Sequence, residues 1–379
     1  MNGSAGLKVP VNDLRRHWQS TQSVVQPAVE RVLASGRYVL GDEVAGFEAA
    51  FAAYCGASHC IGVGNGTDAL ELALRALDVG PGDEVATVAN AGMYASAAIL
   101  AIGARPRFVD VELESLNMDP AALAAVLGGG IRAVIVTHLY GRLADMERLL
   151  PVAAAHDLPV IEDCAQAHGA CRDGRMAGRW GTVGCYSFYP TKNLGALGDG
   201  GALVTDAAVL AERIAALRQY GWGEKYRAGL PGGRNSRLDE LQAAVLAAKL
   251  PLLDDWNQRR RSLAGRYREA LSASSLQLPP APDRADAVHL YVVRSAVRNQ
   301  LRAALARRGI ATEIHYPIPD HRQHAVLQST NAEADLPVTE QAAREVLTLP
   351  CFTDMTETEL DAVVGAVEES LSEIGDRRE

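Results

Sequence analysis

Apolar and polar positions follow two alternating patterns along the first two thirds of the chain. Short apolar runs of strand length are separated by longer segments in which apolar residues recur every three or four positions, the spacing of helices with one buried face. The predicted strands lie at Ile61 and over 83–88, 106–111, 131–136, 159–163, 185–188 and 202–205. The predicted helices cover 25–32, 41–55, a segment from Leu70, a segment ending at 102, 119–127, 146–156 and 207–217.

Strands and helices that alternate in this way form a mostly parallel sheet covered by helices on both faces. We therefore predict a large α/β domain over 1–253. A strand at 290–294, a helix at 299–308 and a strand at 311–315 predict a βαβ-like core for a smaller α/β domain over 254–379. A charged helix from 254–261 leads into this second domain, an amphipathic helix at 356–374 closes it, and the N-terminal segment fits either domain.

Composition narrows the class of protein. The chain has 379 residues, of which 48% are hydrophobic, so it can bury two cores. Its net charge of −9 argues against nucleic acid or an anionic membrane as a partner. No apolar run is long enough to span a membrane, and the polar segment 1–10 leads us to expect no signal peptide. The six cysteines form no CxxC pair and no zinc spacing, which predicts reduced thiols in a cytoplasmic protein without a metal site.

Lys192 stands alone within the segment 187–206, which is otherwise small, apolar or glycine-rich. An ammonium group is poorly solvated in such surroundings, so its neutral amine is favoured. A neutral amine is a nucleophile that can form a Schiff base with an aldehyde. The alternative interpretation of this stretch alone is a surface lysine in a glycine-rich loop.

Two polar segments follow predicted strands, at the edge where open α/β sheets bind ligands. Gly66, Thr67 and Asp68 come after the strand at Ile61 and begin a helix that Thr67 or Asp68 can cap. Backbone N–H groups at such a turn suit a phosphate, although an ordinary helix cap is the alternative. Asp163 ends a buried strand, where a carboxylate needs a cationic or donor partner, unless it simply caps a turn.

A glycine-rich loop is predicted at 220–233, and we expect it to be mobile. It leads into Arg234-Asn235-Ser236-Arg237. Ser236 and Asp239 are spaced as in a capping box, which predicts a helix that runs to about Leu250.

Together these segments resemble one family over nearly the whole chain. The chain is similar to PLP-dependent sugar aminotransferases of the DegT/DnrJ/EryC1/StrS type, which belong to the fold-type I superfamily. The resemblance is strong because several motifs occur in the family's order and spacing. They are Gly36-Arg37-Tyr38-Val39-Leu40-Gly41, Gly66-Thr67-Asp68-Ala69-Leu70, Glu162-Asp163-Cys164-Ala165-Gln166-Ala167-His168-Gly169, Ser187-Phe188-Tyr189-Pro190-Thr191-Lys192-Asn193, Asn235-Ser236-Arg237-Leu238-Asp239-Glu240-Leu241-Gln242-Ala243 and His315-Tyr316-Pro317.

The resemblance implies roles for residues near the cofactor. Lys192 would hold PLP through a Schiff base and, once released, would move a proton between cofactor and substrate. Asp163 would pair with the pyridinium nitrogen so that the ring can accept carbanion charge. Gln166 would contact the ring hydroxyl, and His168 and Asn193 would lie beside the cofactor.

The resemblance also implies how the phosphate is held. Gly66, Thr67 and Ser187 would bind it through backbone N–H and hydroxyl groups. Asn235 would reach the phosphate in the neighbouring subunit, which makes a homodimer the functional unit.

One position departs from the family pattern. Many members place a Phe or Tyr against the PLP ring at a position that, counted from 83–85, is Gly92 here. Met93 or Tyr94 would then supply the contact, and we retain Met93 as a predicted cofactor residue.

Members with a lysine at the Schiff-base position transfer an amino group, generally from L-glutamate, to a keto sugar carried on a nucleotide. The segment 192–201 looks like members that aminate C3 of dTDP-3-keto-6-deoxyhexoses, whereas C4-specific members more often carry threonines and Gly-Glu-Gly-Gly there. The predicted substrate contacts are Tyr189, Tyr220, Lys225, Tyr226, His315, Tyr316 and His321.

Three alternatives remain open. The enzyme could act at C4 of the sugar, or it could be a PLP- or PMP-dependent sugar dehydratase. The dehydratase relatives carry histidine at the Schiff-base position, so Lys192 argues against that interpretation. A PLP-binding regulatory protein without turnover is the third alternative, and intact Lys192, Asp163 and Gln166 argue against it.

Overall fold

The computed structural model describes residues 9–328 and 334–375. Its centre is a seven-stranded sheet with the order β1-β9-β8-β5-β4-β2-β3, so the predicted mostly parallel sheet is confirmed. The five strands from β8 to β3 are parallel, and β9 pairs antiparallel with β8 and β1. The strands are β1 (His59–Val63), β2 (Glu84–Val88), β3 (Arg105–Val109), β4 (Ile131–Thr137), β5 (Val160–Asp163), β8 (Val183–Ser187) and β9 (Gly201–Thr205).

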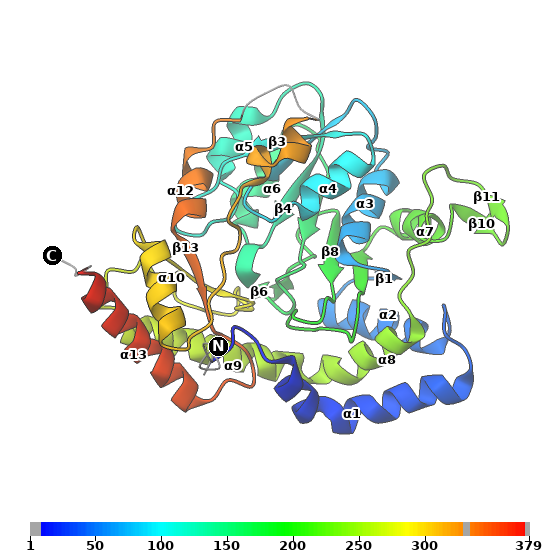
Figure 1. The fold of residues 1–379 in the computed structure, drawn as a ribbon. Coiled ribbons are helices and arrows are strands. Elements are labelled where there is room, and N and C mark those ends of the chain that lie inside the picture. The colour runs from blue at the N-terminus through cyan, green and yellow to red at the C-terminus, as the bar shows by residue number, and fades with distance from the viewer. Residues whose placement is uncertain (1–8, 329–333, 376–379) are drawn as a thin grey trace.

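Helices cover both faces of this sheet (Figure 1). Neighbouring strand residues point to opposite faces, so that Val85 joins one core cluster and Ala86 another. The first cluster packs under α3 (Gly66–Ala76), α4 (Tyr94–Ala101) and α7 (Ala208–Leu217). The other face is covered by α2 (Asp42–Cys55), α5 (Pro120–Val126), α6 (Met146–Ala154) and α8 (Glu240–Lys249).

The first helix is much longer than the predicted 25–32. It is α1 (Leu14–Ser35), which begins where the Asp13 carboxylate caps the N–H groups of Arg15 and Arg16. It packs along α8 at the foot of the molecule (Figure 1). Few residues of α1 are apolar, so the helical spacing of apolar residues predicted only the part of α1 where most of its buried residues lie.

The C-terminal part has its own core, but its predicted βαβ order is wrong. The segment 311–315 is not a strand, and only Glu313 forms a bridge, with Thr348. The partner of β12 (Tyr291–Arg294) is instead β13 (Val346–Leu349), and the two run antiparallel. The other elements are α9 (Leu253–Ala270), α10 (Arg298–Arg307), α11 (His324–Leu327), α12 (Pro337–Glu345) and α13 (Glu357–Ile374). Separation into domains at residue 253 stays a prediction.

The predicted loop at 220–233 contains a small hairpin, with β10 (Trp222–Glu224) paired to β11 (Arg227–Ala228). Figure 1 shows this hairpin projecting from the body of the molecule, next to α7. Trp222 of this hairpin is half-buried, whereas Tyr226 is 77% accessible. A second small hairpin joins β6 (Cys171–Arg172) and β7 (Arg175–Met176).

Two predicted helix caps are wrong. Asn65, rather than Thr67 or Asp68, caps α3, because its side-chain oxygen accepts the N–H of Asp68 at 2.8 Å. Ser236 does not form a capping box with Asp239, since its hydroxyl donates to the Asp68 carboxylate at 2.6 Å. In both cases a partner outside the predicted motif offers a better-placed acceptor.

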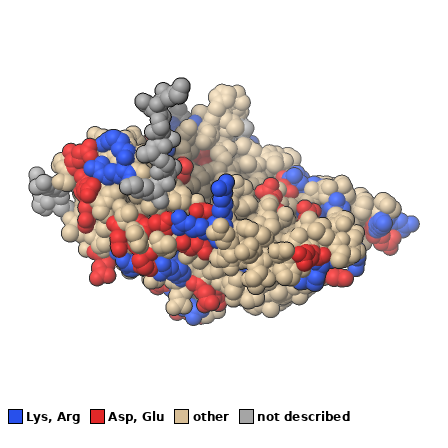
Figure 2. All heavy atoms as spheres, turned by 60° about the horizontal axis from the view of Figure 1, so that its bottom comes forward, with Lys and Arg blue, Asp and Glu red and all other residues tan. Residues whose placement is uncertain are grey.

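Acidic and basic side chains lie next to one another over the face shown in Figure 2. Many charged groups of the chain are paired, such as Arg16 with Glu359 at 2.6 Å and Arg308 with Glu373 at 2.8 Å. An exposed pair such as Arg308 with Glu373 contributes little to stability, whereas the Arg16–Glu359 pair is partly buried. Within 9–328 and 334–375, no helix is both long enough and apolar enough to cross a membrane.

Candidate active site

The carboxyl ends of β5 and β8 lie side by side at the edge where ligands bind in open α/β sheets. Asp163 is the last residue of β5, Ser187 is the last residue of β8, and Lys192 follows in the next loop. A cavity of about 520 Å³ opens there. The predicted site residues that line it are Gly66, Thr67, Asp163, Gln166, Ser187, Tyr189, Lys192, His315 and Tyr316.

Lys192 and Asp163 form the chemical centre of this cavity. Burial lowers the pKa of the Lys192 amine to about 8, and the negative charge of Asp163 opposes that shift. At pH 7, roughly one tenth of such amines are neutral and able to attack a carbonyl group. Burial raises the pKa of the Asp163 carboxyl, while the Ala165 N–H, 3.1 Å away, and the Lys192 charge act in the opposite direction.

The beginning of α3 forms a second part of the cavity wall. Gly66 is required there, because a Cβ atom on it would lie 2.6 Å from the Cβ of Ser187. Asn65 caps the helix by accepting the N–H of Asp68. In the described part of the chain, the backbone N–H groups of Gly66 and Thr67 donate to no protein acceptor. Free N–H groups at a helix N-terminus, beside the Ser187 hydroxyl, suit an anion such as a phosphate.

Gln166 is held by hydrogen bonds at both ends of its amide. Its oxygen accepts the Tyr140 N–H at 2.6 Å, and its nitrogen donates to the Tyr316 hydroxyl at 3.1 Å. Tyr140 in turn donates its hydroxyl to the carbonyl of His315. The segment around residue 315 is therefore attached to the ends of β4 and β5.

Two predicted cofactor residues lie behind the cavity rather than in its wall. The buried amide of Asn193 donates to Asn257 and to the carbonyl of Ala287, both at 2.8 Å. His168 is fully buried between Tyr186 and Phe188, and within the described residues neither ring nitrogen makes a hydrogen bond of normal geometry. Burial lowers the pKa of His168 to about 3, so the ring is neutral at physiological pH.

Other predicted residues lie elsewhere in this chain. Met93 precedes α4, and its side chain packs with Ala89 and Phe108. His321 is buried and lies 3.2 Å from the Glu340 carboxylate. Four predicted residues in and around the hairpin do not line the cavity. They are Tyr220, Lys225, Tyr226 and Asn235.

Sequence reasoning missed His289, which lines the cavity together with Lys192. It comes just before β12, and a lone histidine among apolar residues gave no functional signal. Tyr94, at the start of α4, also lines the cavity. The sequence names Tyr94 as the alternative to Met93 for the ring contact that Gly92 cannot supply.

A buried polar cluster lies at the carboxyl ends of β4 and β5, next to Asp163. His138, Glu162 and Cys164 offer ligand atoms within 4.8 Å of one another. The Glu162 carboxylate, however, accepts the N–H groups of Gly178, Trp180 and Gly181 and lies 2.9 Å from His138 Nε2. Both carboxylate oxygens of Glu162 are engaged in these hydrogen bonds, so the cluster links neighbouring segments of the chain.

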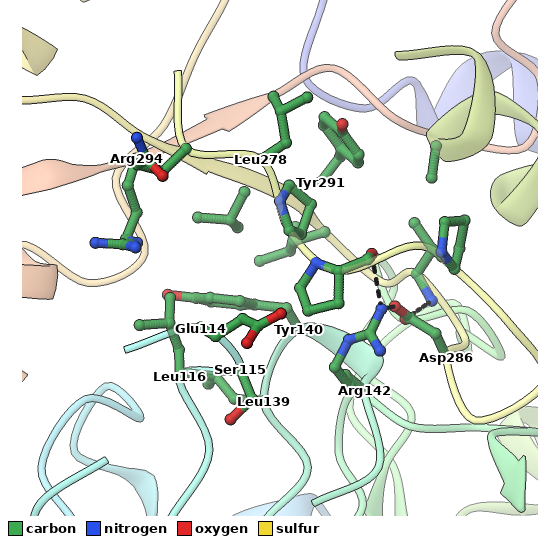
Figure 3. A pocket seen from close by; sticks show the side chains of 18 of the residues that line it. Glu114, Ser115, Leu116, Leu139, Tyr140, Arg142, Leu278, Asp286, Tyr291 and Arg294 are labelled. Atoms are coloured by element: carbon green, nitrogen blue, oxygen red, sulfur yellow. Dashed lines mark hydrogen bonds and ion pairs between the residues drawn. The ribbon is translucent and has the colours of Figure 1, made fainter. Parts of the chain in front are cut away.

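A second cavity, of about 360 Å³, lies where Tyr140 and its neighbours meet the segment before β12. Figure 3 shows the Arg142 guanidinium group beside the Asp286 carboxylate, at 2.8 Å. Arg294 is likewise paired, with Glu345 at 2.7 Å. Both arginines of this cavity are therefore paired, and the residues that line it include no lysine, so the candidate nucleophile lies in the first cavity.

Comparison with known proteins gives the class of this fold and site. Residues 19–368 match the DegT/DnrJ/EryC1/StrS aminotransferase family, and the chain belongs to that family. The structure of S. venezuelae DesV in complex with a ketimine intermediate is similar, with a TM-score of 0.91 and 44% identity over 95% of this chain and 98% of that chain.

Two curated relatives cover the chain almost completely. One is the dTDP-3-amino-3,6-dideoxy-alpha-D-galactopyranose transaminase of Aneurinibacillus thermoaerophilus, 47% identical over 95% of this chain and 98% of the relative. The other, from Geobacillus stearothermophilus, is described as a pleiotropic regulatory protein and is 41% identical over 96% of this chain and 98% of the relative. The predicted family and the fold-type I class are confirmed.

Proposed function

We propose that this aminotransferase binds PLP and transfers the amino group of L-glutamate to C3 of a dTDP-linked 3-keto-6-deoxyhexose. The observation that carries the proposal is the arrangement of three groups around one cavity. These are the amine of Lys192, the carboxyl of Asp163 and the free N–H groups that begin α3. PLP carries an aldehyde, a pyridine nitrogen and a phosphate. The amine suits the aldehyde, the carboxyl suits the protonated pyridine nitrogen, and the N–H groups suit the phosphate.

Each group has a task that follows from its chemistry. PLP, when bound, would supply an electron sink for the negative charge that develops on the carbon atom that carries the transferred amino group. Lys192 holds the cofactor's carbonyl carbon and, as a free amine with a lowered pKa, accepts and returns a proton at its Nζ atom. Asp163 stabilises a proton on the pyridine nitrogen. Burial of its carboxyl favours an arrangement in which the negative charge is paired.

The choice of C3 rests on two supports. The segment 192–201 is similar to C3-specific members, and the relative from Aneurinibacillus thermoaerophilus carries a 3-amino sugar in its name. A C4-specific transaminase is the first alternative. A sugar dehydratase is disfavoured by Lys192. The similarity to the Geobacillus protein, which is described as regulatory, supports the alternative of a regulatory protein. The presence of Lys192 and Asp163 in one cavity favours an enzyme instead.

The proposed active site also requires a second copy of the chain. Asn235 and the hairpin residues Tyr220, Lys225 and Tyr226 lie outside the cavity of their own chain. The hairpin projects from the body of the molecule, which supports a role in the cavity of a partner (Figure 1). We propose a homodimer in which Asn235 reaches the partner's phosphate site. A cytoplasmic location and the absence of nucleic-acid partners stay predictions.

The direct test is the absorbance spectrum of the purified protein before and after L-glutamate. A Schiff base with Lys192 gives a band near the visible edge, and amino transfer moves it to the near ultraviolet. Lys192→Ala should remove the first band. The dTDP-3-keto-6-deoxyhexose should then restore it. A band that responds to glutamate but to no 3-keto sugar would leave the class intact and contradict the substrate, whereas a protein that shows no band with added PLP would contradict the proposal.

A further inference from the structure

Gly92 and Tyr316 approach each other more closely than any side chain at position 92 would permit. A Cβ atom on Gly92 would lie 2.7 Å from Cε1 of the Tyr316 ring and 2.9 Å from Cδ1 and Cζ. Gly92 also has a φ of +78°, a conformation that glycine adopts without strain. The ring of Tyr316 thus occupies the space where a larger residue at position 92 would extend.

The ring of Tyr316 is held in the wall of the cavity. Its hydroxyl accepts a hydrogen bond from Gln166 at 3.1 Å. The ring of Tyr94 meets it edge to face, with 6.2 Å between the ring centres. Tyr316 lines the same cavity as Lys192 and Asp163. Tyr94 and Tyr189 line it too, but they are 49% and 53% exposed, so Tyr316 is the better buried of the three.

The chain that carries Tyr316 is fixed to both sides of Gly92. The Asp320 carboxylate is fully buried and accepts the Met93 N–H at 2.9 Å and the Ser96 hydroxyl at 2.6 Å. The Asp320 N–H donates to the carbonyl of Ala89 at 2.7 Å. Pro317 and Pro319 lie between Tyr316 and Asp320 and restrict the backbone there. The position of Tyr316 is therefore set by bonds that span residues 89 to 96.

We propose that Tyr316 is the aromatic residue that contacts the flat ring of the cofactor in this chain, and that Gly92 is small because Tyr316 takes its place. The inference rests on the proposed binding of PLP. A pyridinium ring paired with Asp163 is electron-poor, and the electron-rich face of a tyrosine ring attracts it. Tyr316 comes from the C-terminal part of the chain, whereas Gly92 follows β2, so the contact joins segments far apart in sequence.

The test is a double-mutant cycle between positions 92 and 316, read as the dissociation constant of PLP for the cofactor-free protein. Tyr316→Ala should weaken binding about 3- to 10-fold, the range expected for loss of one aromatic contact. Tyr316→Phe keeps the ring and should bind within about twofold of wild type. Gly92→Phe should also weaken binding, because two rings then compete for one space.

The deciding comparison is Tyr316→Ala within the Gly92→Phe background. Removal of the Tyr316 ring should there restore affinity, opposite in sign to its effect in wild type. The backbone strain that Gly92→Phe introduces is present in both members of that comparison and cancels. Tyr316→Leu provides a second variant that keeps the space filled, and circular dichroism of the cofactor-free proteins verifies folding.

Two outcomes separate this inference from the function beneath it. Equal PLP affinity for wild type, Tyr316→Ala and Tyr316→Leu would overturn the role of Tyr316 and leave PLP binding intact. Additive effects of the substitutions at 92 and 316 would also overturn it, because they would mean that the two side chains do not share a space. A wild-type protein that binds no PLP would overturn the proposed function and this inference together.

Discussion

The imidazole Nδ1 of His289 lies 3.0 Å from the side-chain oxygen of Asn193. An amide oxygen only accepts, so Nδ1 carries the hydrogen and Nε2 is left as an acceptor. Burial and the Lys192 charge hold the pKa of His289 well below its usual range, so the ring stays neutral. Asn257 and the carbonyl of Ala287 accept from the other end of the same amide. The residue beside Lys192 is thereby fixed from three directions.

Loss of the His289 bond should slow the attack of Lys192 on PLP. His289→Asn places an N–H group near the position of Nδ1 and should keep most of the wild-type rate. His289→Gln places its amide further out and should lower the rate about tenfold or more, because small misplacements of a reacting group are costly. Stopped-flow absorbance of the cofactor-free proteins measures both rates. Identical rates for the two variants would contradict the positioning role.

The rate at which Lys192 forms its Schiff base should depend on pH with a midpoint near 8, the value to which burial lowers its pKa. Below the midpoint the neutral fraction falls about tenfold per pH unit. The folded pKa is lower than the value of 10.5 for the unfolded chain, so this group's contribution to stability is fully present above about pH 10.5 and is lost as the pH falls through about 8.

Lys249 supplies a matched control for that experiment. Burial also lowers its pKa to about 8, but its amine donates to the carbonyl of Gly195 and does not line the cavity. Lys249→Met should leave the midpoint of the rate profile unchanged. Stability measurements alone would mix the two lysines, whereas the absorbance signal belongs to Lys192. A midpoint near 10.5 would show that the amine is solvated.

Asp163→Asn should leave folding intact and impair turnover. Burial already raises the pKa of this carboxyl, so the fold gives limited support to its charge, and the amide has nearly the same shape. Without the carboxylate the pyridine nitrogen loses its partner, and the half-reaction with L-glutamate should slow about 10²- to 10⁴-fold. Single-turnover absorbance measures this step. A variant with the wild-type rate would remove Asp163 from the mechanism.

The sequence predicted the elements whose signals are local. The buried runs of β2, β4 and β5 are apolar enough to be found by their pattern, and Asp163 is noticed because it ends one of them. The motif around Lys192 is continuous, and burial in the structure agrees with the expectation from its apolar neighbours.

What escaped prediction depends on contacts between distant segments. β13 pairs with β12 across a long intervening stretch of chain, and no local pattern assigns that partner in place of 311–315. The Glu240 carboxylate accepts the N–H groups of Gly41 and Val44, so a cap of α2 comes from another helix. His289 reaches the cavity only through tertiary packing, which is why the sequence did not reveal it, whereas Tyr316, a predicted substrate contact, does line the cavity.

Glu162→Gln should destabilise the protein, although Glu162 is the direct neighbour of Asp163. Its carboxylate accepts three backbone N–H groups at 2.6 to 2.8 Å, and an amide nitrogen in that position would face donors. We expect a loss of about 2–4 kcal/mol in the free energy of unfolding, measured by urea denaturation. Asp163→Asn is the matched control and should lose far less. Equal losses would contradict the different roles of the two carboxyls.

A mixed dimer tests whether Asn235 acts in the partner's cavity. A chain with Lys192→Ala is joined to a chain with Asn235→Ala, and the heterodimer is isolated through two different tags. If Asn235 acts across the interface, one of the two sites combines an intact Lys192 with an intact Asn235. The heterodimer should then show about half of the wild-type activity, while each variant homodimer is impaired at both of its sites.

If Asn235 acts within its own chain, neither site is whole, and the heterodimer should not exceed the average of the two variant homodimers. The projecting hairpin that precedes Asn235 favours the first result, because its Tyr226 is exposed and does not line the cavity of its own chain.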